Sequence, residues 1–114
     1  MNKKQKRINE AMRLVHPSYR PIKNVIKISK ANSFNHELGK FMKCWELLND
    51  EIDFYTEVIF CGGGRCDIFI PYRFQVIEIL HSETTKEALS KTDKYPKELE
   101  IFLIKSEDVI KNEY

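Results

Sequence analysis

The chain has 114 residues, of which 42% are hydrophobic, 11% aromatic and 32% charged, and its formal net charge is +2. This length supplies one hydrophobic core and excludes two independent catalytic domains, while the composition excludes intrinsic disorder. The longest apolar runs are only a few residues, far below the roughly 20 that a membrane-spanning helix needs. We therefore expect one compact domain that does not cross a membrane.

The N-terminus and the cysteines indicate the compartment. The basic N-terminus is not followed by the apolar segment and cleavage site of a secretory signal, so we expect a cytoplasmic protein. The chain has three cysteines, an odd number, which argues against a disulfide framework. Cys61 and Cys66 flank a glycine run with a spacing that matches structural zinc sites poorly. We expect reduced cysteines that serve packing.

Charge is distributed unevenly along the chain. Residues 1–30 contain nine Lys or Arg and one Glu, a net charge of +8, whereas residues 31–114 carry −6. A basic segment gains free energy from counterion release on a polyanion, and nucleic acid is the commonest such partner in a cytoplasm. We therefore predict that residues 1–32 are a basic arm that binds nucleic acid, with a solvated tail as the alternative. The predicted contacts are Lys3, Lys4, Lys6, Arg7, Arg13 and, beyond the arm, Arg65.

The first half of the chain predicts two helices. A short basic helix runs from Asn2 to Leu14 and ends before Pro17, because proline cannot continue a helix. Residues 22–29 fit either an extended strand or a loop. From Ser33, a candidate N-cap, apolar residues recur every three or four positions up to Asn49. This pattern predicts an amphipathic helix whose Trp45 and other aromatic residues lie in the core.

In the second half of the chain the residue pattern changes to one that is typical of β-strands. Residues 54–60 and 65–70 predict a hairpin around the glycines at 62–64, and residues 74–80 predict a third strand. A short polar helix is expected over 84–94, followed by a strand over 99–104 and a helix over 106–113. Because a helix precedes it, the last strand can join the third one in parallel through a right-handed crossover.

Two acids lie inside otherwise apolar strands, Asp67 in the second and Glu78 in the third. An ionised carboxylate is costly to bury unless something pairs with it. If the two strands are antiparallel neighbours, both carboxylates can share a divalent cation, for which oxygen ligands suit Mg²⁺ or Mn²⁺. The alternative is a buried salt bridge with Arg65 or a lysine. Glu37, on the amphipathic helix, is a third acid that can face the same place.

The order of these elements and acids resembles the PD-(D/E)xK nuclease superfamily, which includes archaeal Holliday-junction resolvases and small viral or plasmid-borne nucleases. The resemblance covers residues 33–105 and rests on Glu37, on Gly64-Arg65-Cys66-Asp67 and on Glu78. It implies an α/β fold in residues 33–114 with a restriction-endonuclease-like αβββαβ core, a mixed sheet flanked by helices. It also implies catalytic roles for Glu37, Asp67 and Glu78, with Asp67 and Glu78 as ligands of Mg²⁺ or Mn²⁺.

The chain departs from the family at the motif lysine, where it has Leu80. Lys91 and Lys94, on the following helix, are the candidate catalytic replacements, and Ser82 is a further polar candidate. The resemblance implies a divalent-metal-dependent endonuclease that hydrolyses DNA phosphodiester bonds, of branched or of viral or plasmid DNA, with a homodimer as a candidate assembly. The alternatives are a catalytically inactive nucleic-acid-binding protein on the same fold and a structural protein with salt-bridged acids.

Overall fold

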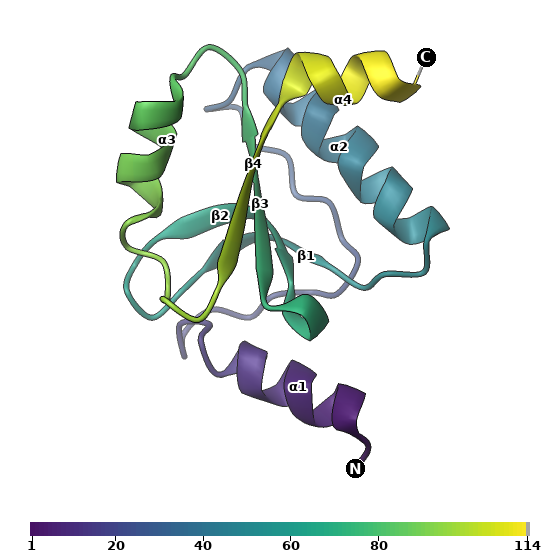
Figure 1. Ribbon diagram of the computed structural model, residues 1–114, viewed down its shortest axis with the longest axis vertical. Helices are drawn as coiled ribbons and strands as arrows, with labels where there is room; N and C mark the ends of the chain where they lie inside the picture. Colours follow the sequence, from purple (N-terminus) through teal and green to yellow (C-terminus); the bar gives the residue numbers. More distant parts are fainter. Residues whose placement is uncertain (114) are drawn as a thin grey trace.

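A computed structural model describes residues 1–113 of the chain (Figure 1). Its helices and strands follow the order expected from the sequence, and most boundaries lie within two residues of the predicted ones. The elements are α1 (Lys3–Met12), α2 (Phe34–Asn49), β1 (Tyr55–Ile59), β2 (Arg65–Ile70), the 3-10 turn η1 (Pro71–Arg73), β3 (Gln75–Leu80), α3 (Thr85–Thr92), β4 (Glu100–Lys105) and α4 (Ser106–Glu113).

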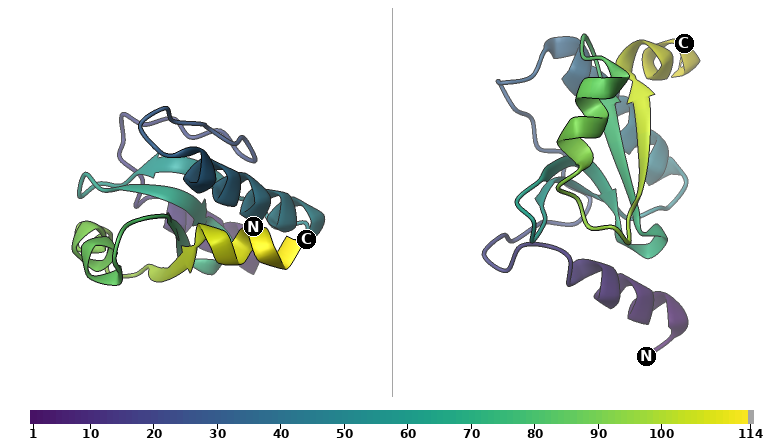
Figure 2. Two further views of the ribbon diagram at one scale, coloured as in Figure 1. Left: turned by 90° about the horizontal axis from the view of Figure 1, so that it is seen from above. Right: turned by 60° about the vertical axis from the view of Figure 1, so that its left-hand side comes forward.

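The strands form one mixed sheet in the order β1-β2-β3-β4. Strands β1, β2 and β3 are antiparallel neighbours, and β4 joins β3 in parallel after the α3 crossover. Helices α2 and α4 cover one face of the sheet and α3 lies on the other (Figures 1 and 2). The α/β class with a four-stranded mixed sheet flanked by helices is therefore confirmed. None of the described helices is long and apolar enough to span a bilayer.

The two central strands are apolar on both faces because helices or loops cover both. Ile68 and Ile77 pack towards α2, in a cluster with Cys44, whereas Phe69 packs on the opposite face against Phe60. The sheet is thus buried along β2 and β3. All three cysteines are free thiols, of which Cys44 and Cys66 are buried and Cys61 is exposed.

The basic N-terminal segment packs as part of the domain. Ala11 and Val15 lie in the core beside β1, and Val15 forms a bridge with Phe60. Further along, the backbone N–H of Lys27 donates to Thr56 Oγ1 at 2.9 Å. The connector between α1 and α2 therefore covers the outer edge of β1. Residues 22–29 contain no strand, which favours the loop over the strand among the two sequence-based alternatives.

Helix α2 corrects one expectation, because Trp45 is 53% exposed rather than buried. The face of α2 that meets the sheet carries Cys44 and Leu47, which are buried. Trp45 and Phe41 lie on a second apolar stripe of the same helix and stack on each other with ring centroids 6.3 Å apart. Apolar spacing predicts a helix, but it did not distinguish the buried stripe from the exposed one.

Candidate functional site

Eight side chains form a buried polar cluster around the β2–β3 ladder. They come from five elements of the fold and from the loop after α3. The cluster consists of His36, Glu37 and Lys40 of α2, Glu57 of β1, Asp67 of β2, Glu78 of β3, Lys91 of α3 and Tyr95.

Asp67 and Glu78 meet where the β2–β3 ladder ends. The paired residues run from Ile70 opposite Gln75 to Ile68 opposite Ile77 and stop there. At the next position the Asp67 carboxylate accepts a hydrogen bond from the backbone N–H of Ile79 at 2.8 Å. The side chains of Asp67 and Glu78 influence each other's pKa and are 3% and 2% exposed. The two acids therefore lie on neighbouring strands at this end of the ladder.

The first turn of α2 supplies the partner of Asp67. Ser33 caps the helix by accepting a hydrogen bond from the backbone N–H of His36, which turns this residue towards the sheet. His36 Nδ1 lies 2.7 Å from Glu37 Oε1, and Nε2 lies 3.2 Å from Asp67 Oδ2. Burial lowers the pKa of His36, but the hydrogen bonds and charges of Asp67 and Glu37 outweigh it and raise the pKa to about 9. His36 is thus an imidazolium that donates to both carboxylates.

Lys40 is fully buried and pairs with Glu37 and Glu57. Its Nζ lies 2.7 Å from Glu37 Oε2 and 3.6 Å from Glu57 Oε1. Glu37 also accepts a hydrogen bond from the backbone N–H of Ser29 at 3.0 Å. Burial raises the pKa of Glu37, but the bonds from Lys40, Ser29 and His36 together lower it. Glu37 is therefore an ionised acid whose oxygens already hold α2 and the preceding loop.

Glu78 draws its partners from the opposite face of the sheet. Lys91 Nζ lies 3.7 Å from Glu78 Oε2, with the lysine side chain half exposed. The hydroxyl of Tyr95 contacts Glu78 Oε1 and donates to the Arg65 carbonyl oxygen at 2.7 Å. Burial and the charge of Asp67 raise the pKa of Glu78, whereas the His36 hydrogen bond lowers that of Asp67 against the effect of burial. The two shifts have opposite directions, so Glu78 takes up a proton more readily than Asp67 does.

The glycine turn between β1 and β2 positions Tyr95. A Cβ atom at Gly64 would come within 2.6 Å of the Tyr95 ring, and one at Gly62 within 2.5 Å of the Lys94 carbonyl oxygen. Gly63 has a φ of +90°, a region that L side chains rarely adopt. The glycines thus allow the loop after α3 to lie directly on the hairpin, which brings the tyrosine hydroxyl to Glu78.

The structure brings together four of the five predicted catalytic residues, Glu37, Asp67, Glu78 and Lys91. The fifth, Lys94, lies with its main chain against Gly62 and forms no ion pair with the acids in the part of the chain that the structure describes. Ser82 lies in a separate hollow with His81 and Ser106.

The predicted nucleic-acid contacts are divided between two places. Arg65 precedes Asp67 by two residues on β2. Helix α1, with the four predicted basic residues Lys3, Lys4, Lys6 and Arg7, packs on η1, which joins the end of β2 to the start of β3. Asp67 and Glu78 lie towards the other ends of these strands. Arg13 follows α1 directly as its C-cap and is exposed.

Sequence reasoning missed the roles of His36, Lys40, Glu57 and Tyr95. The available signal was on α2, where Glu37 and Lys40 are spaced three apart, so that their side chains share a helix face. That face also carries the buried Cys44 and Leu47, and charged residues there need partners. No comparable local signal existed for Tyr95, which follows the crossover helix.

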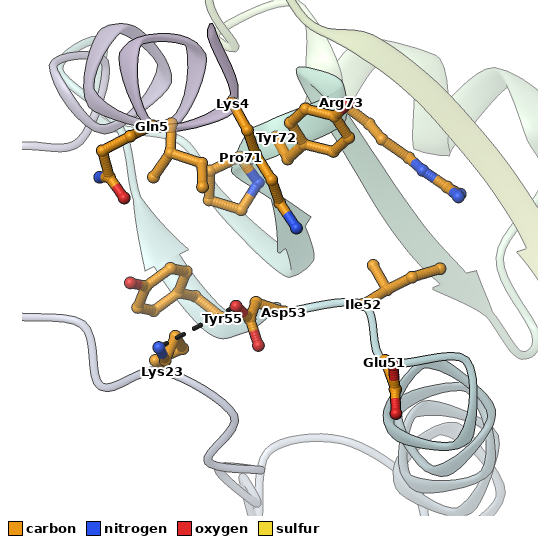
Figure 3. Close-up of a pocket in the computed structure, with 11 residues that line it drawn as sticks. Lys4, Gln5, Lys23, Glu51, Ile52, Asp53, Tyr55, Pro71, Tyr72 and Arg73 are labelled. Atoms are coloured by element: carbon orange, nitrogen blue, oxygen red, sulfur yellow. Dashed lines mark ion pairs between the residues drawn. The ribbon is translucent and has the colours of Figure 1, made fainter. Parts of the chain in front are cut away.

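A cavity of about 280 Å³ lies between α1, η1 and the segment that leads into β1 (Figure 3). Lys4 and Arg73 line it together with the acids Glu51 and Asp53, and Lys23 pairs with Asp53 at 3.9 Å. The cavity shares no residue with the buried polar cluster. Its mixed charges favour no particular class of ligand.

Known proteins and metal-site geometry give no independent assignment. No group of three or more His, Cys, Asp or Glu side chains among the described residues is arranged to hold a metal ion. Comparison with protein-family models, curated proteins and solved structures gave no match to this chain. The chemistry of the site is therefore argued from its own geometry.

Proposed function

We propose that this protein is a divalent-metal-dependent nuclease that hydrolyses DNA phosphodiester bonds, of branched or of viral or plasmid DNA, on a restriction-endonuclease-like core. The observation that carries the proposal is the contact of Asp67 and Glu78 at the end of the β2–β3 ladder, with Lys91 Nζ 3.7 Å from Glu78. The order helix, three strands, helix, strand from α2 to β4 supports it, because this order resembles the PD-(D/E)xK nucleases.

The donor set fits Mg²⁺ or Mn²⁺. Such ions are commonly held by one or two carboxylates, with the remaining coordination places left for water and substrate phosphate, and Asp67 and Glu78 are two carboxylates in contact. The charge of Asp67 contributes to the raised pKa of Glu78, and a cation held by both carboxylates would relieve that repulsion. When bound, the metal ion supplies a water of lowered pKa and offsets negative charge on the phosphate.

The remaining side chains position these groups. The imidazolium of His36 donates to Asp67 and so fixes the direction of its carboxylate. The hydroxyl of Tyr95 contacts Glu78 Oε1 and restricts the position of that carboxyl group. Lys91 is half exposed, so its ammonium can reach a substrate phosphate as well as Glu78 and stabilise negative charge that develops there. It thereby takes the role of the lysine that is absent at Leu80.

A nicking assay on branched and linear DNA tests the proposal. We expect cleavage with Mg²⁺ or Mn²⁺, none with a chelator, and none from the Asp67→Asn variant. Lys91→Ala should lose at least about 100-fold in rate, the usual range for one group that stabilises transition-state charge. Lys94→Ala is the matched control and should keep its activity. Cleavage that persists in Asp67→Asn would refute the proposal.

The alternative is a catalytically inactive nucleic-acid-binding protein on the same fold. The burial of Asp67 and Glu78 favours it, because both already have protein partners. In that case the wild-type protein would bind DNA in a salt-dependent way but would not cleave it with any divalent metal.

A further inference from the structure

A cleft of about 440 Å³ opens beside the buried polar cluster. The connector between α1 and α2 forms one wall, and β1 and the first residue of β2 form the other. Its lining includes Tyr19, Lys27, Ser29, Lys30, Glu57 and Arg65. Glu57 is itself a member of the cluster and pairs with Lys40, and the backbone N–H of Ser29 donates to Glu37.

Cations dominate this cleft. Lys27, Lys30 and Arg65 face a single acid, Glu57, whose carboxylate is already paired with the buried Lys40. Lys27 is held in place, because its Nζ donates to the Tyr19 hydroxyl at 2.7 Å and lies 4.6 Å from the centre of the tyrosine ring. Lys30 and Arg65 are exposed, and neither forms an ion pair among the described residues. The cleft therefore offers an anion one fixed and two available cations.

Two of the basic side chains of α1, unlike those of the cleft, contact the turn η1 and Phe74. Arg7 Nε donates to the Tyr72 carbonyl oxygen at 2.6 Å, and its guanidinium lies 4.5 Å from the Phe74 ring centre. Lys4 Nζ lies 5.2 Å from the centre of the Tyr72 ring. These contacts attach α1 to η1, at the end of the β2–β3 pair away from Asp67 and Glu78. Helix α1 is thus poorly placed to present a strand to the acids.

We infer that this cleft, rather than the α1 surface, binds the sugar-phosphate backbone of one nucleic-acid strand next to the acids. Phosphate contacts fix the register of a nucleic acid on a protein, and Arg65 and Glu57 join the cleft to the strands that carry the cluster. The inference deepens the proposed function, on which it rests for the claim that the bound strand is the one to be cleaved.

Binding without cleavage tests the inference. A fluorescently labelled 20-nucleotide single strand is titrated with protein in chelator, and anisotropy is followed at several salt concentrations. The Lys30→Gln/Arg65→Gln variant removes two cleft charges. The matched control, Lys3→Gln/Lys6→Gln, removes two exposed charges from α1. Thermal melting verifies that both variants fold.

We expect the cleft variant to bind at least about 10-fold more weakly. Its slope of log affinity against log salt should fall by about 1.4, or roughly 0.7 for each lost phosphate contact to a single strand. The α1 variant should change affinity by no more than about twofold. Equal losses in the two variants, a loss confined to the α1 variant, or no binding by the wild type would overturn the inference.

The two proposals fail separately. If the wild type binds through the cleft but never cleaves with Mg²⁺ or Mn²⁺, the proposed nuclease activity is refuted. The cleft is then still the nucleic-acid-binding site. The opposite outcome is a wild type that cleaves and a Lys30→Gln/Arg65→Gln variant with unchanged DNA binding and unchanged KM for DNA. In that case the nuclease activity is supported and the cleft is refuted as the nucleic-acid-binding site.

Discussion

Replacing Glu78 by glutamine should stabilise the protein at neutral and alkaline pH. Glutamine has nearly the same shape as glutamate and cannot ionise. The Glu78 carboxyl is buried against Asp67, and burial and that charge raise its pKa. Folding at neutral pH therefore requires Glu78 to take up a proton or to tolerate a second negative charge. Glu78→Gln removes this requirement and leaves Asp67 with its His36 partner.

The size of the effect follows from two estimates. Two unit charges about 4 Å apart repel by about 4 kcal/mol at an effective dielectric constant near 20. Alternatively, Glu78 takes up a proton on folding, which costs about 1.4 kcal/mol of folding free energy for each pH unit above its ordinary pKa of 4.5. Because the protein can always take this route, the total cost is at most about 5 kcal/mol at pH 8. The amide does not reproduce every bond of the acid. We therefore expect a gain of about 2 kcal/mol at pH 8.

The sign of the pH dependence follows from the direction of the shift. A carboxyl with a raised pKa in the folded state supports folding while it is protonated, below its unfolded pKa. That contribution is lost as the pH rises towards the folded pKa. The wild type should therefore lose stability relative to Glu78→Gln between about pH 5 and pH 8, with little difference at pH 5.

Urea unfolding at pH 5, 6.5 and 8, followed by circular dichroism, measures the difference. Glu98→Gln, an exposed acid in a loop, is the matched control and should change stability by less than about 0.5 kcal/mol. Added Mg²⁺ should raise the wild-type melting temperature and leave that of Glu78→Gln nearly unchanged. If Glu78→Gln is less stable than the wild type at pH 8, the carboxylate is ionised and serves a structural ion pair with Lys91, and our reasoning is refuted.

Three further predictions test the fold around the site. Removing residues 1–30 should abolish cooperative thermal unfolding, because Ala11 and Val15 then leave the core; a truncated chain that still melts sharply would contradict this. Trp45→Ser should cost less than about 1 kcal/mol in urea unfolding and Phe54→Ala about 3–5 kcal/mol, since only the phenylalanine is fully buried. Gly64→Ala should cost about 1–3 kcal/mol and shift the near-ultraviolet circular dichroism, because its methyl group would displace the Tyr95 ring. An unchanged melting temperature would refute this last reasoning.

Local patterns in the sequence were sufficient for the elements and their order. Apolar residues every three or four positions identified α2, and Ser33 marked its start, because helix periodicity and N-capping depend only on neighbours in the chain. The alternation in the strands and the glycines before Arg65 identified the hairpin for the same reason. The crossover through α3 then left a parallel β4 as the natural arrangement.

The sequence also marked the two central acids. Asp67 and Glu78 interrupt apolar strands, and this is visible without a structure because burying a charge is costly. The antiparallel neighbourhood of β2 and β3 follows from the short connection through η1. A meeting of the two carboxylates could therefore be expected from strand pairing alone.

The surroundings of these acids depend on contacts between elements far apart in the chain. His36 reaches Asp67 and Lys40 reaches Glu57 because α2 crosses the sheet on one face. Lys91 reaches Glu78 because α3 returns on the other face. The helix expected over 84–94 would have placed Lys91 and Lys94 on one face, but α3 ends at Thr92 and Lys94 lies beyond it. The position of Lys94 depends on how closely the loop after α3 approaches the hairpin, and the missing side chains at Gly62 and Gly64 set that approach.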